Sequence, residues 1–409
     1  MLNQTQLKKW LKKIMSNWDK NSWTKAGVIM QLPKYEDEKL LNKIQTQLAN
    51  SPELIDYESI VELKKHLAAL NQNESFLIIG GPCAEDIVFN SDYIKKTIET
   101  IITLSKNISQ QTQHEVIYGG RIGGQFAKPR TEQYETIGNQ TLPVYKGDMI
   151  NHIDFTVTAR TPKPELMIDG YTTSSKTIKL GKKLDPKFYF THEALLIHYE
   201  EPQIKTKGSE HYLSSTHIPW IGERTRNADS AHVEFLRGII NPVGIKCSET
   251  TKVEELINII RKLNPDNLPG KILLIIRMGK KIAEHLPKMI DGIKQANLNV
   301  IYICDPCHAN IQKLLDGTKI RYFTDIEQEV KAFLQICLEH HVHPGGIHAE
   351  LCGIETTECI GLNVEIDHVK NKYLTKCDPN MNKTQALALA KIWADTYNEE
   401  RKKYENINS

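Results

Sequence analysis

Four short segments of this 409-residue chain each offer a side chain that could bind a metal ion. One is a thiol, one an imidazole and two are carboxylates. The candidate ligands are Cys83, His308, Glu350 and Asp378. A mixed sulfur, nitrogen and oxygen set suits Mn²⁺, Co²⁺, Zn²⁺ or Fe²⁺ better than Ca²⁺ or Mg²⁺, which prefer oxygen ligands alone. Each residue taken singly also fits a structural role, as a core thiol, a core histidine, a partner of an arginine or a turn residue.

Cationic residues are dense in the segments between these candidate ligands. They are Arg121, Lys128, Arg130, Arg224, Arg226, Lys246 and Arg277. Lys246 and Arg277 each end an apolar run, so we expect both to be buried and to need an anionic partner. Glu223 offers a carboxylate to pair with a cation or to orient a water molecule. A metal beside arginines and lysines is typical of chemistry on phosphorylated substrates, because the metal polarises a carbonyl while guanidinium groups hold phosphate and carboxylate.

The elements that must position these residues are short apolar segments separated by helical stretches. Continuous apolar runs favour parallel strands that are covered on both faces. The eight candidate strands span residues 76–79, 115–118, 187–190, 217–220, 243–246, 272–277, 300–304 and 346–350. Apolar residues at helical spacing predict helices over 252–263, 281–296 and 325–340. Repeated strand–helix units favour an α/β fold of the (β/α)8 TIM-barrel class, although periodicity alone leaves an open doubly wound sheet possible.

The positions of the reactive residues favour the barrel. Nearly all of them lie at or just after the carboxyl end of a candidate strand, and a TIM barrel gathers those ends at a single mouth. The residues concerned are Cys83, Arg121, His192, Glu223, Lys246, Arg277, His308 and Glu350. A barrel therefore predicts one pocket built from residues hundreds of positions apart.

The remaining segments complete the predicted organisation. Residues 1–70 are interpreted as an N-terminal helical extension, with an amphipathic helix near residues 7–18 and a break at 31–35, and residues 71–409 as the catalytic barrel. Residues 129–186 are longer than one crossover requires, which is typical of a loop that covers a site. Within them we expect a loop over 141–148 and a helix over 164–184, interrupted at Gly170. Residues 383–405 are predicted to form a C-terminal helix.

Composition excludes several classes of protein. The formal net charge is +2, so no global field points to nucleic acid or to a membrane surface. The longest apolar runs are too short to span a bilayer, and no signal peptide is visible. Eight cysteines lack the spacing of a secreted disulfide framework, so a cytoplasmic protein is expected. Cys304 and Cys307 form one C-x-x-C pair, but no second pair follows to complete a structural zinc site.

Long motifs in a fixed order then connect the chain with a known family. Over nearly its whole length the sequence closely resembles the type II 3-deoxy-D-arabino-heptulosonate 7-phosphate (DAHP) synthases. The motifs span residues 76–85, 120–130 (GRIGGQFAKPR), 145–151 (YKGDMIN), 191–194 (THEA), 220–226 (WIGERTR), 229–246, 304–308 (CDPCH), 343–350 (HPGGIHAE) and 377–379 (CDP).

The resemblance implies a TIM barrel that condenses phosphoenolpyruvate, erythrose 4-phosphate and water to DAHP and phosphate, the first step of the shikimate pathway. It assigns Cys83, His308, Glu350 and Asp378 to a divalent metal, with Mn²⁺ or Co²⁺ favoured and Zn²⁺ or Fe²⁺ as alternatives. It assigns Arg121, Glu223, Arg224, Lys246 and Arg277 to phosphoenolpyruvate, with Glu223, Lys246 and Arg277 catalytic. It assigns Lys128, Arg130 and Thr131 to erythrose 4-phosphate, and it implies a homodimer or homotetramer.

The chain also departs from the family pattern. Pro82, Gly123, Cys307 and Ala309 stand where members usually carry Asp, Ala, Met and Gly. The short N-terminal extension resembles compact members found in phenazine and other secondary-metabolite clusters. Two alternative functions are considered. One is a related synthase that joins phosphoenolpyruvate to another sugar phosphate. The other is a non-catalytic partner of a chorismate mutase.

Overall fold

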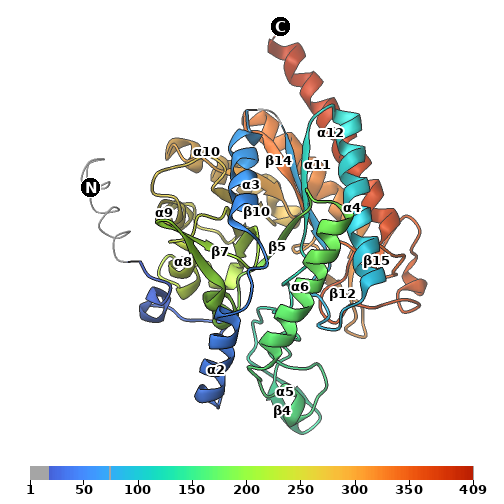
Figure 1. The fold of residues 1–409 in the computed structure, drawn as a ribbon. Helices are drawn as coiled ribbons and strands as arrows, with labels where there is room; N and C mark the ends of the chain where they lie inside the picture. The colour runs from blue at the N-terminus through green and yellow to red at the C-terminus, as the bar shows by residue number, and fades with distance from the viewer. Residues whose placement is uncertain (1–17, 73–74, 409) are drawn as a thin grey trace.

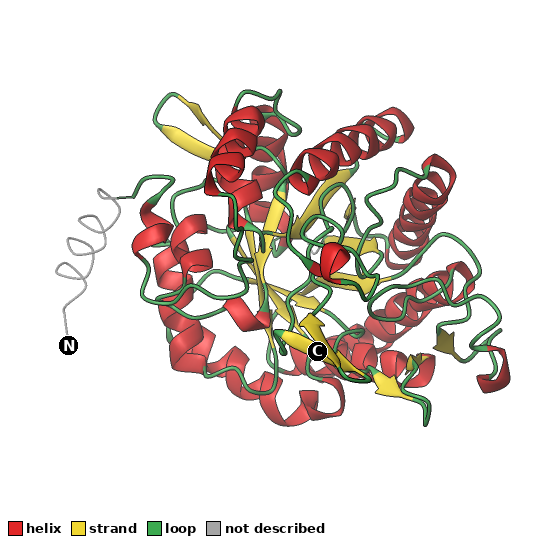
Figure 2. Ribbon diagram, turned by 90° about the horizontal axis from the view of Figure 1, so that it is seen from below, coloured by secondary structure: helices red, strands yellow, loops and turns green. Residues whose placement is uncertain are grey.

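A closed barrel of parallel strands forms the centre of the computed structural model, which describes residues 18–72 and 75–408. The eight strands of its described part follow the order β1-β14-β11-β10-β9-β8-β5-β2, and β1 pairs with both β2 and β14, which closes the ring. Figure 2 shows this ring of strands surrounded by helices. The strands are β1 (Phe76–Gly81), β2 (Val116–Gly120), β5 (Tyr189–Glu193), β8 (Ile218–Ile221), β9 (Val243–Cys247), β10 (Ile272–Ile276), β11 (Ile301–Cys304) and β14 (Pro344–Glu350). The predicted TIM barrel is confirmed, and the open sheet is excluded by the closure.

Long helices cover the outside of the barrel. They are α4 (Ser91–Thr112), α6 (Leu166–Leu184), α9 (Val253–Leu263), α10 (Ile282–Gln295), α11 (Phe323–Glu339) and α12 (Lys383–Asn408). The helices predicted over 252–263, 281–296, 325–340 and 383–405 are confirmed. The predicted interruption at Gly170 is wrong, since α6 continues through it. A Cβ atom at Gly170 would lie 2.4 Å from Cε of Met149, so this glycine permits close packing rather than a break.

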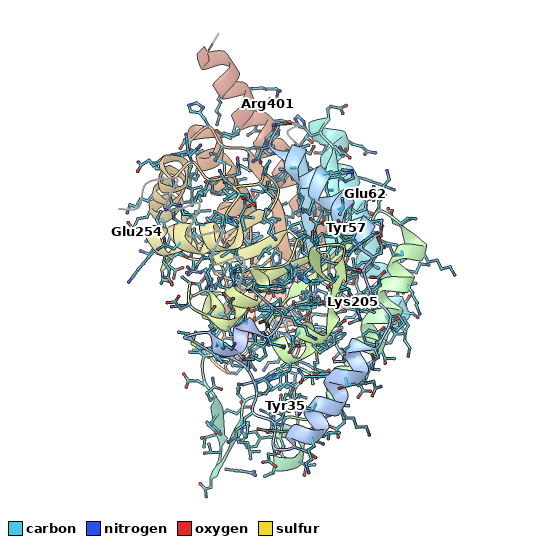
Figure 3. All side chains as sticks on the ribbon, turned by 60° about the vertical axis from the view of Figure 1, so that its left-hand side comes forward. Tyr35, Tyr57, Glu62, Lys205, Glu254 and Arg401 are labelled. Carbon is cyan, nitrogen blue, oxygen red and sulfur yellow. The ribbon has the colours of Figure 1, made fainter. Side chains whose placement is uncertain are left out.

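In the part of the chain that the structure describes, three helical elements precede the barrel. They are η1 (Ser22–Lys25), α2 (Glu38–Ala49) and α3 (Tyr57–Leu70). Asp37 and Asp56 cap α2 and α3 by accepting hydrogen bonds from Leu40 N and Ser59 N. Helix α3 lies across the barrel in Figure 1, where it is blue. Figure 3 labels Tyr57 and Glu62 on it. The amphipathic helix expected near residues 7–18 falls almost wholly outside the described residues.

The amino end of the barrel is filled by apolar side chains. Leu63, Leu67 and Leu70 of α3 join a buried cluster with inward residues of the strands, which are Leu77, Ile79, Ile117, Tyr189, Ile218, Leu273, Ile301 and Ile303. Successive residues of a strand alternate between the two faces, so positions two residues farther along also face inward. At the carboxyl end those positions are polar.

Shorter elements lie at both ends of the barrel. The predicted loop over 141–148 is partly wrong, because β3 (Tyr134–Ile137) and β4 (Gln140–Pro143) form an antiparallel hairpin. Gly138 and Asn139 make its two-residue turn, with Gly138 at φ +59°, a conformation that glycine adopts without strain. The other short elements are α5 (Val157–Arg160), α7 (Ile197–Glu200), η2 (Glu201–Gln203), β6 (Ile204–Lys207), β7 (Glu210–Leu213), η3 (Glu223–Thr225), α8 (Ala231–Leu236), η4 (Gly279–Lys281), β12 (Gln312–Lys313), β13 (Lys319–Tyr322), β15 (Cys359–Ile360) and η5 (Ile366–His368).

Helix α12 closes the chain against the barrel wall. It lies beside α4 and α11, and Trp393 and Tyr397 make edge-on ring contacts with Phe76 at the start of β1. Figure 3 labels Arg401 near the far end of α12, which projects beyond the barrel. Among the described residues, no helix combines the length and the apolar character that a membrane crossing requires.

Candidate active site

The carboxyl mouth of the barrel is lined by buried charges. Arg121 follows inward-facing Gly119 by two residues, and Lys246 follows Gly244 in the same way. Arg121 is 1% exposed and Glu350 is fully buried. Charges so deeply buried require ionic partners or a bound ligand. The mouth therefore has the polarity of a site for charged molecules.

Three of the predicted metal ligands form one compact group. The ligand atoms of Cys83, Glu350 and Asp378 all lie within 4.8 Å of one another. Cys83 follows β1, Glu350 ends β14, and Asp378 lies in the segment before α12, so three distant parts of the chain supply them. This convergence is the main observation in favour of a metal centre.

His308 lies beside this group and is oriented toward it. Its Nε2 is 2.9 Å from Glu350 Oε1, while its Nδ1 is 2.7 Å from Asp305 Oδ2. An imidazole held by a carboxylate at one nitrogen presents the other nitrogen as a ligand. The structure thus brings all four predicted ligands together, with His308 joined to the others through Glu350.

The donor atoms already attract a positive charge. Lys128 Nζ lies 2.6 Å from Cys83 Sγ and 3.3 Å from Asp378 Oδ2. Burial acts to raise the pKa of the Asp378 carboxyl, but Lys128 and Lys319 outweigh it and hold that pKa well below its usual range. Burial also raises the pKa of the Cys83 thiol, so the thiolate form needs a strong cation at the sulfur. One thiolate, one imidazole and two carboxylates around such a point fit a borderline divalent metal.

Two arginines hold the Glu350 carboxylate. Arg121 Nη2 is 3.1 Å from Oε1, and Arg321 Nη2 pairs with Oε2. Burial opposes the charge of Glu350, but His308 and the two arginines keep its pKa well below its usual range. Arg321 was missed by sequence reasoning. It comes from β13, a strand outside the barrel, and no periodic pattern marks it.

Asp305 and His348 were also missed, although a signal for both exists. Asp305 follows inward-facing Ile303 by two residues, and His348 precedes Glu350 by two, so strand alternation alone would have placed them at the mouth. His348 Nδ1 is 3.4 Å from Asp305 Oδ2. Burial raises the pKa of Asp305, but His308 and Lys246 lower it by more. The pKa of this carboxyl therefore lies well below its usual value.

Most of the residues predicted for phosphoenolpyruvate belong to or follow the neighbouring strands β8, β9 and β10, whereas Arg121 follows β2 on the opposite side of the ring. Lys246 Nζ is 3.6 Å from Asp305 Oδ2 and 3.1 Å from His308 Nε2, and burial lowers its pKa to about 8. Arg277 Nη1 is 3.9 Å from Glu223 Oε2. Trp220 lies under two of the cations, with its ring centre 5.3 Å from Arg121 Cζ and 5.9 Å from Lys246 Nζ.

An open cavity of about 540 Å³ joins this side to solvent. Glu223, Ser248, Arg277 and His308 are among its lining residues. Buried polar atoms without a hydrogen-bond partner in the described chain lie around the mouth, including Arg121 Nε, Arg277 Nε and Glu223 Oε2. Unsatisfied buried donors are costly, so they favour an anionic ligand here.

The residues predicted for erythrose 4-phosphate are less compact. Lys128 points to Cys83 and Asp378, whereas Arg130 Nε donates to the carbonyl oxygen of Tyr145 at 2.7 Å. Arg224 donates to Thr131 Oγ1 through Nε and Nη2, at 3.0 and 2.7 Å. Arg224, predicted for one substrate, thus touches Thr131, predicted for the other.

His192 does not face the mouth. Its Nε2 pairs with Glu200 Oε1 at 2.8 Å, so it is a structural residue of the barrel wall. The alternation of β5 points Glu193 inward instead, and its Oε1 is buried without a partner among the described residues. Sequence reasoning selected His192 for its type and overlooked the side chain beside it.

Two departures from the family pattern have a local explanation. Gly123 has φ +81°, where an alanine would be strained. Cys307 is buried, and its Sγ accepts a hydrogen bond from Glu350 N at 3.3 Å, so the thiol touches the backbone of a predicted ligand. Neither change removes a ligand.

Comparison with known proteins gives a consistent result. The Class-II DAHP synthetase family matches residues 18–186 and 179–394 of this chain. A phospho-2-dehydro-3-deoxyheptonate aldolase of Streptomyces coelicolor is 33% identical over 93% of this chain and 97% of its own. One from Neurospora crassa is 32% identical, with 95% and 96% covered. A protein of Pseudomonas fluorescens named as a probable enzyme of the same activity is 33% identical, with 89% and 94% covered.

Proposed function

The chain belongs to the Class-II DAHP synthetase family, and on that premise we propose how its residues divide the work of the reaction. The activity is that of a DAHP synthase, also named phospho-2-dehydro-3-deoxyheptonate aldolase, the first step of the shikimate pathway. Phosphoenolpyruvate, erythrose 4-phosphate and water give DAHP and phosphate. The observation that carries the proposal is the convergence of Cys83, Glu350 and Asp378 beside a cluster of buried cations.

Phosphoenolpyruvate is assigned to the part of the mouth lined by residues that follow β8, β9 and β10, with Arg121 extending over Trp220 from the opposite strand β2. Arg121, Lys246 and Arg277 bring fixed positive charge to its carboxylate and phosphate, and Arg224 lies at the rim. Guanidinium groups that hold an anion in one orientation lower the barrier by placing the reacting carbon correctly. Oε2 of Glu223 accepts no hydrogen bond from the described residues, which supports a role in orienting the water that adds to C2.

Erythrose 4-phosphate is assigned to the segment that follows β2. Lys128 reaches the metal ligands, so it would lie close to the aldehyde end. Arg130 and Thr131 lie farther out and are assigned to the phosphate. The contact between Arg224 and Thr131 supports a shared boundary between the two substrates, which bimolecular bond formation requires.

Cys83, His308, Glu350 and Asp378 would hold the divalent metal. When bound, such a metal supplies a Lewis acid that polarises the aldehyde carbonyl. The sulfur and nitrogen donors support Mn²⁺, Co²⁺, Zn²⁺ or Fe²⁺, and Mn²⁺ or Co²⁺ is favoured. Asp305 keeps the His308 ring turned toward the site, and the two arginines on Glu350 keep that carboxylate charged.

The bond changes then follow from the substrates. C3 of phosphoenolpyruvate attacks the aldehyde carbon, water adds at C2, and the C2–O bond to phosphate breaks. Buried Arg121 and Lys246, together with the partly exposed Arg277, neutralise the charge of phosphoenolpyruvate throughout. Their burial strengthens these interactions, because screening by water is reduced.

The test is phosphate release from the two substrates, measured with and without chelator. Activity that requires both substrates supports the proposal. Competition between erythrose 4-phosphate and other sugar phosphates examines the alternative of a related synthase, because Lys128 and Arg130 recognise charge rather than sugar length. No turnover with any sugar phosphate would favour a non-catalytic role beside a chorismate mutase.

The finer assignments are part of the same proposal. A homodimer or homotetramer is expected from the family resemblance and is tested by sedimentation equilibrium.

A further inference from the structure

A fully buried carboxylate stands behind the metal ligands without touching them. Glu358 lies between β14 and β15 and is 0% exposed. We propose that Glu358 is a positioning residue for the metal centre, because it holds the loop that carries Asp378 and is connected through Asn380 to the backbone of Cys83. The inference rests on the proposed metal site and adds a residue to it.

The carboxylate accepts four hydrogen bonds from one loop. Oε1 accepts from Leu374 N at 2.8 Å and from Thr375 N at 2.9 Å. Oε2 accepts from Asn380 N at 2.7 Å and from Asn380 Nδ2 at 3.1 Å. These donors lie on both sides of Asp378, so a single side chain fixes the two ends of the turn that presents this ligand.

The same carboxylate is linked to a second ligand. Asn380 donates to Glu358 through Nδ2 and accepts from Cys83 N through Oδ1, at 3.0 Å. Cys83 and Asp378 are almost 300 residues apart in the sequence, yet both are connected to Glu358. Asp378 is connected through the backbone of its loop, and Cys83 is connected through the side chain of Asn380. Glu358 therefore links the backbone positions of both predicted ligands.

The other contacts of the loop are made by its side chains, since Asp378 pairs with Lys128 and Lys319 and Lys376 pairs with Asp148. Residues 374–380 form neither helix nor strand, and Leu374 is 54% exposed. A segment without a hydrogen-bonded ladder keeps its shape through side-chain contacts. Loss of a group that orients metal ligands typically lowers metal affinity about 10- to 100-fold.

Cobalt titration of the metal-free, full-length protein tests the inference without substrates. The thiolate–cobalt absorption band of Cys83 gives both the affinity and the ligand geometry. We expect Glu358→Gln to weaken Co²⁺ binding about 10-fold or more and to shift this band, because the amide nitrogen cannot accept from the loop. Glu355→Gln is the matched control. Glu355 lies three residues earlier and is exposed, and it binds Thr384 and Asn363 instead of the 374–380 loop.

The hydrogen-bonded link through Asn380 leads to a second prediction. Asn380→Ala and Glu358→Gln should weaken cobalt binding less together than the sum of their separate effects, since both break the same connection. Circular dichroism and thermal midpoints establish that each variant is folded. If Glu358→Gln does not fold, Glu358→Asp is tested in its place. Unchanged affinity in a folded Glu358 variant, or equal losses in the Glu355 control, would overturn the inference. Absence of a thiolate band in the wild-type protein would instead refute the proposed metal ligands.

Discussion

At the scale of single residues, burial determines which charges can exist in this site. Glu350 is fully buried, yet Arg121, Arg321 and His308 keep it ionised. Lys128 lies among the metal donors, where its ammonium attracts Cys83 and Asp378. Removing one member of such a cluster leaves the others unpaired, so we expect substitutions here to be costly.

Chelation should abolish activity, and Mn²⁺ or Co²⁺ should restore it. The physical reason is the thiolate, imidazole and carboxylate set, which binds borderline metals better than Mg²⁺. His308→Ala should lose metal and turnover together, whereas His192→Ala, which changes a histidine of the barrel wall, should retain metal. Metal content by mass spectrometry and phosphate release are the measurements. Full turnover with no bound metal would refute this prediction.

Arg277→Ala should raise the Michaelis constant for phosphoenolpyruvate or reduce turnover by at least about 10-fold, the loss of a charge-assisted pair of roughly 1.5–3 kcal/mol. Its Nε is buried without a partner in the described chain. Lys280→Ala is the control, because Lys280 lines the same cavity while its side chain is 74% exposed. Steady-state kinetics with both substrates separate the two variants. Equal kinetics would show that the arginine is structural.

Cys83 and Cys377 should form a disulfide when the metal is removed in air. The two thiols belong to one buried cluster, and the interaction with Cys83 lowers the pKa of Cys377 to about 7. Dissolved oxygen would accept the two electrons and two protons released as the sulfur–sulfur bond forms. Peptide mapping should find this bond in metal-free protein and not in metal-loaded protein. Cys377→Ser should resist inactivation, while Cys352→Ser, another buried thiol, should behave as wild type.

At the scale of elements, the barrel strands serve two separate tasks. Apolar inward residues of β1, β2, β5, β8, β10 and β11 fill the amino end, and charged residues near the carboxyl ends, such as Glu193, Lys246 and Glu350, line the mouth. Helix α3 completes the first task from outside the barrel. The loops after the strands complete the second, and glycines let them approach closely. A Cβ at Gly124, for example, would lie 2.1 Å from His192 Nδ1.

Leu67→Ala should destabilise the fold by about 2–5 kcal/mol, the usual cost of a large cavity in a core. Leu67 is 1% exposed and packs with the inward residues of the barrel strands. Leu268→Ala is the control, because Leu268 is 48% exposed. Thermal unfolding is the measurement, with kinetics of the folded variant at low temperature expected to be close to wild type. A shift no larger than that of the control would show that α3 does not support the barrel.

At the scale of the whole molecule, chemistry and stability lie at opposite ends of the barrel. The amino end holds a buried lysine that the reaction does not use. Lys271 precedes β10 and donates to the carbonyl oxygens of Ile239 and Asn241. Burial, followed by the charge of Lys64, lowers its pKa to about 7.

This lysine should make stability depend on pH. Between about pH 7 and pH 10.5 the unfolded chain binds the proton that the folded chain has released, so stability rises with pH in this window. From about pH 6 to pH 9 the contribution is roughly 3 kcal/mol, and it should vanish in Lys271→Met. Thermal midpoints at both pH values, compared between wild type and variant, give the difference. Parallel pH profiles of thermal stability in the two proteins would contradict the prediction. Changed Michaelis constants in Lys271→Met would contradict the statement that the reaction does not use this lysine.

The sequence by itself indicated the barrel, because eight apolar runs alternate with helical patterns and the reactive residues follow the runs. It also predicted Cys83, His308, Glu350 and Asp378 as metal ligands through residue type and family motifs. Only the tertiary structure decided that the ring of strands closes, that His192 faces the wall, that Arg321 reaches Glu350 from β13, and that Glu358 binds the loop around Asp378. Strand periodicity is a local property that a sequence displays. Contacts between loops and inserted strands depend on which distant segments of the chain meet in the tertiary structure. No local sequence pattern encodes which segments meet.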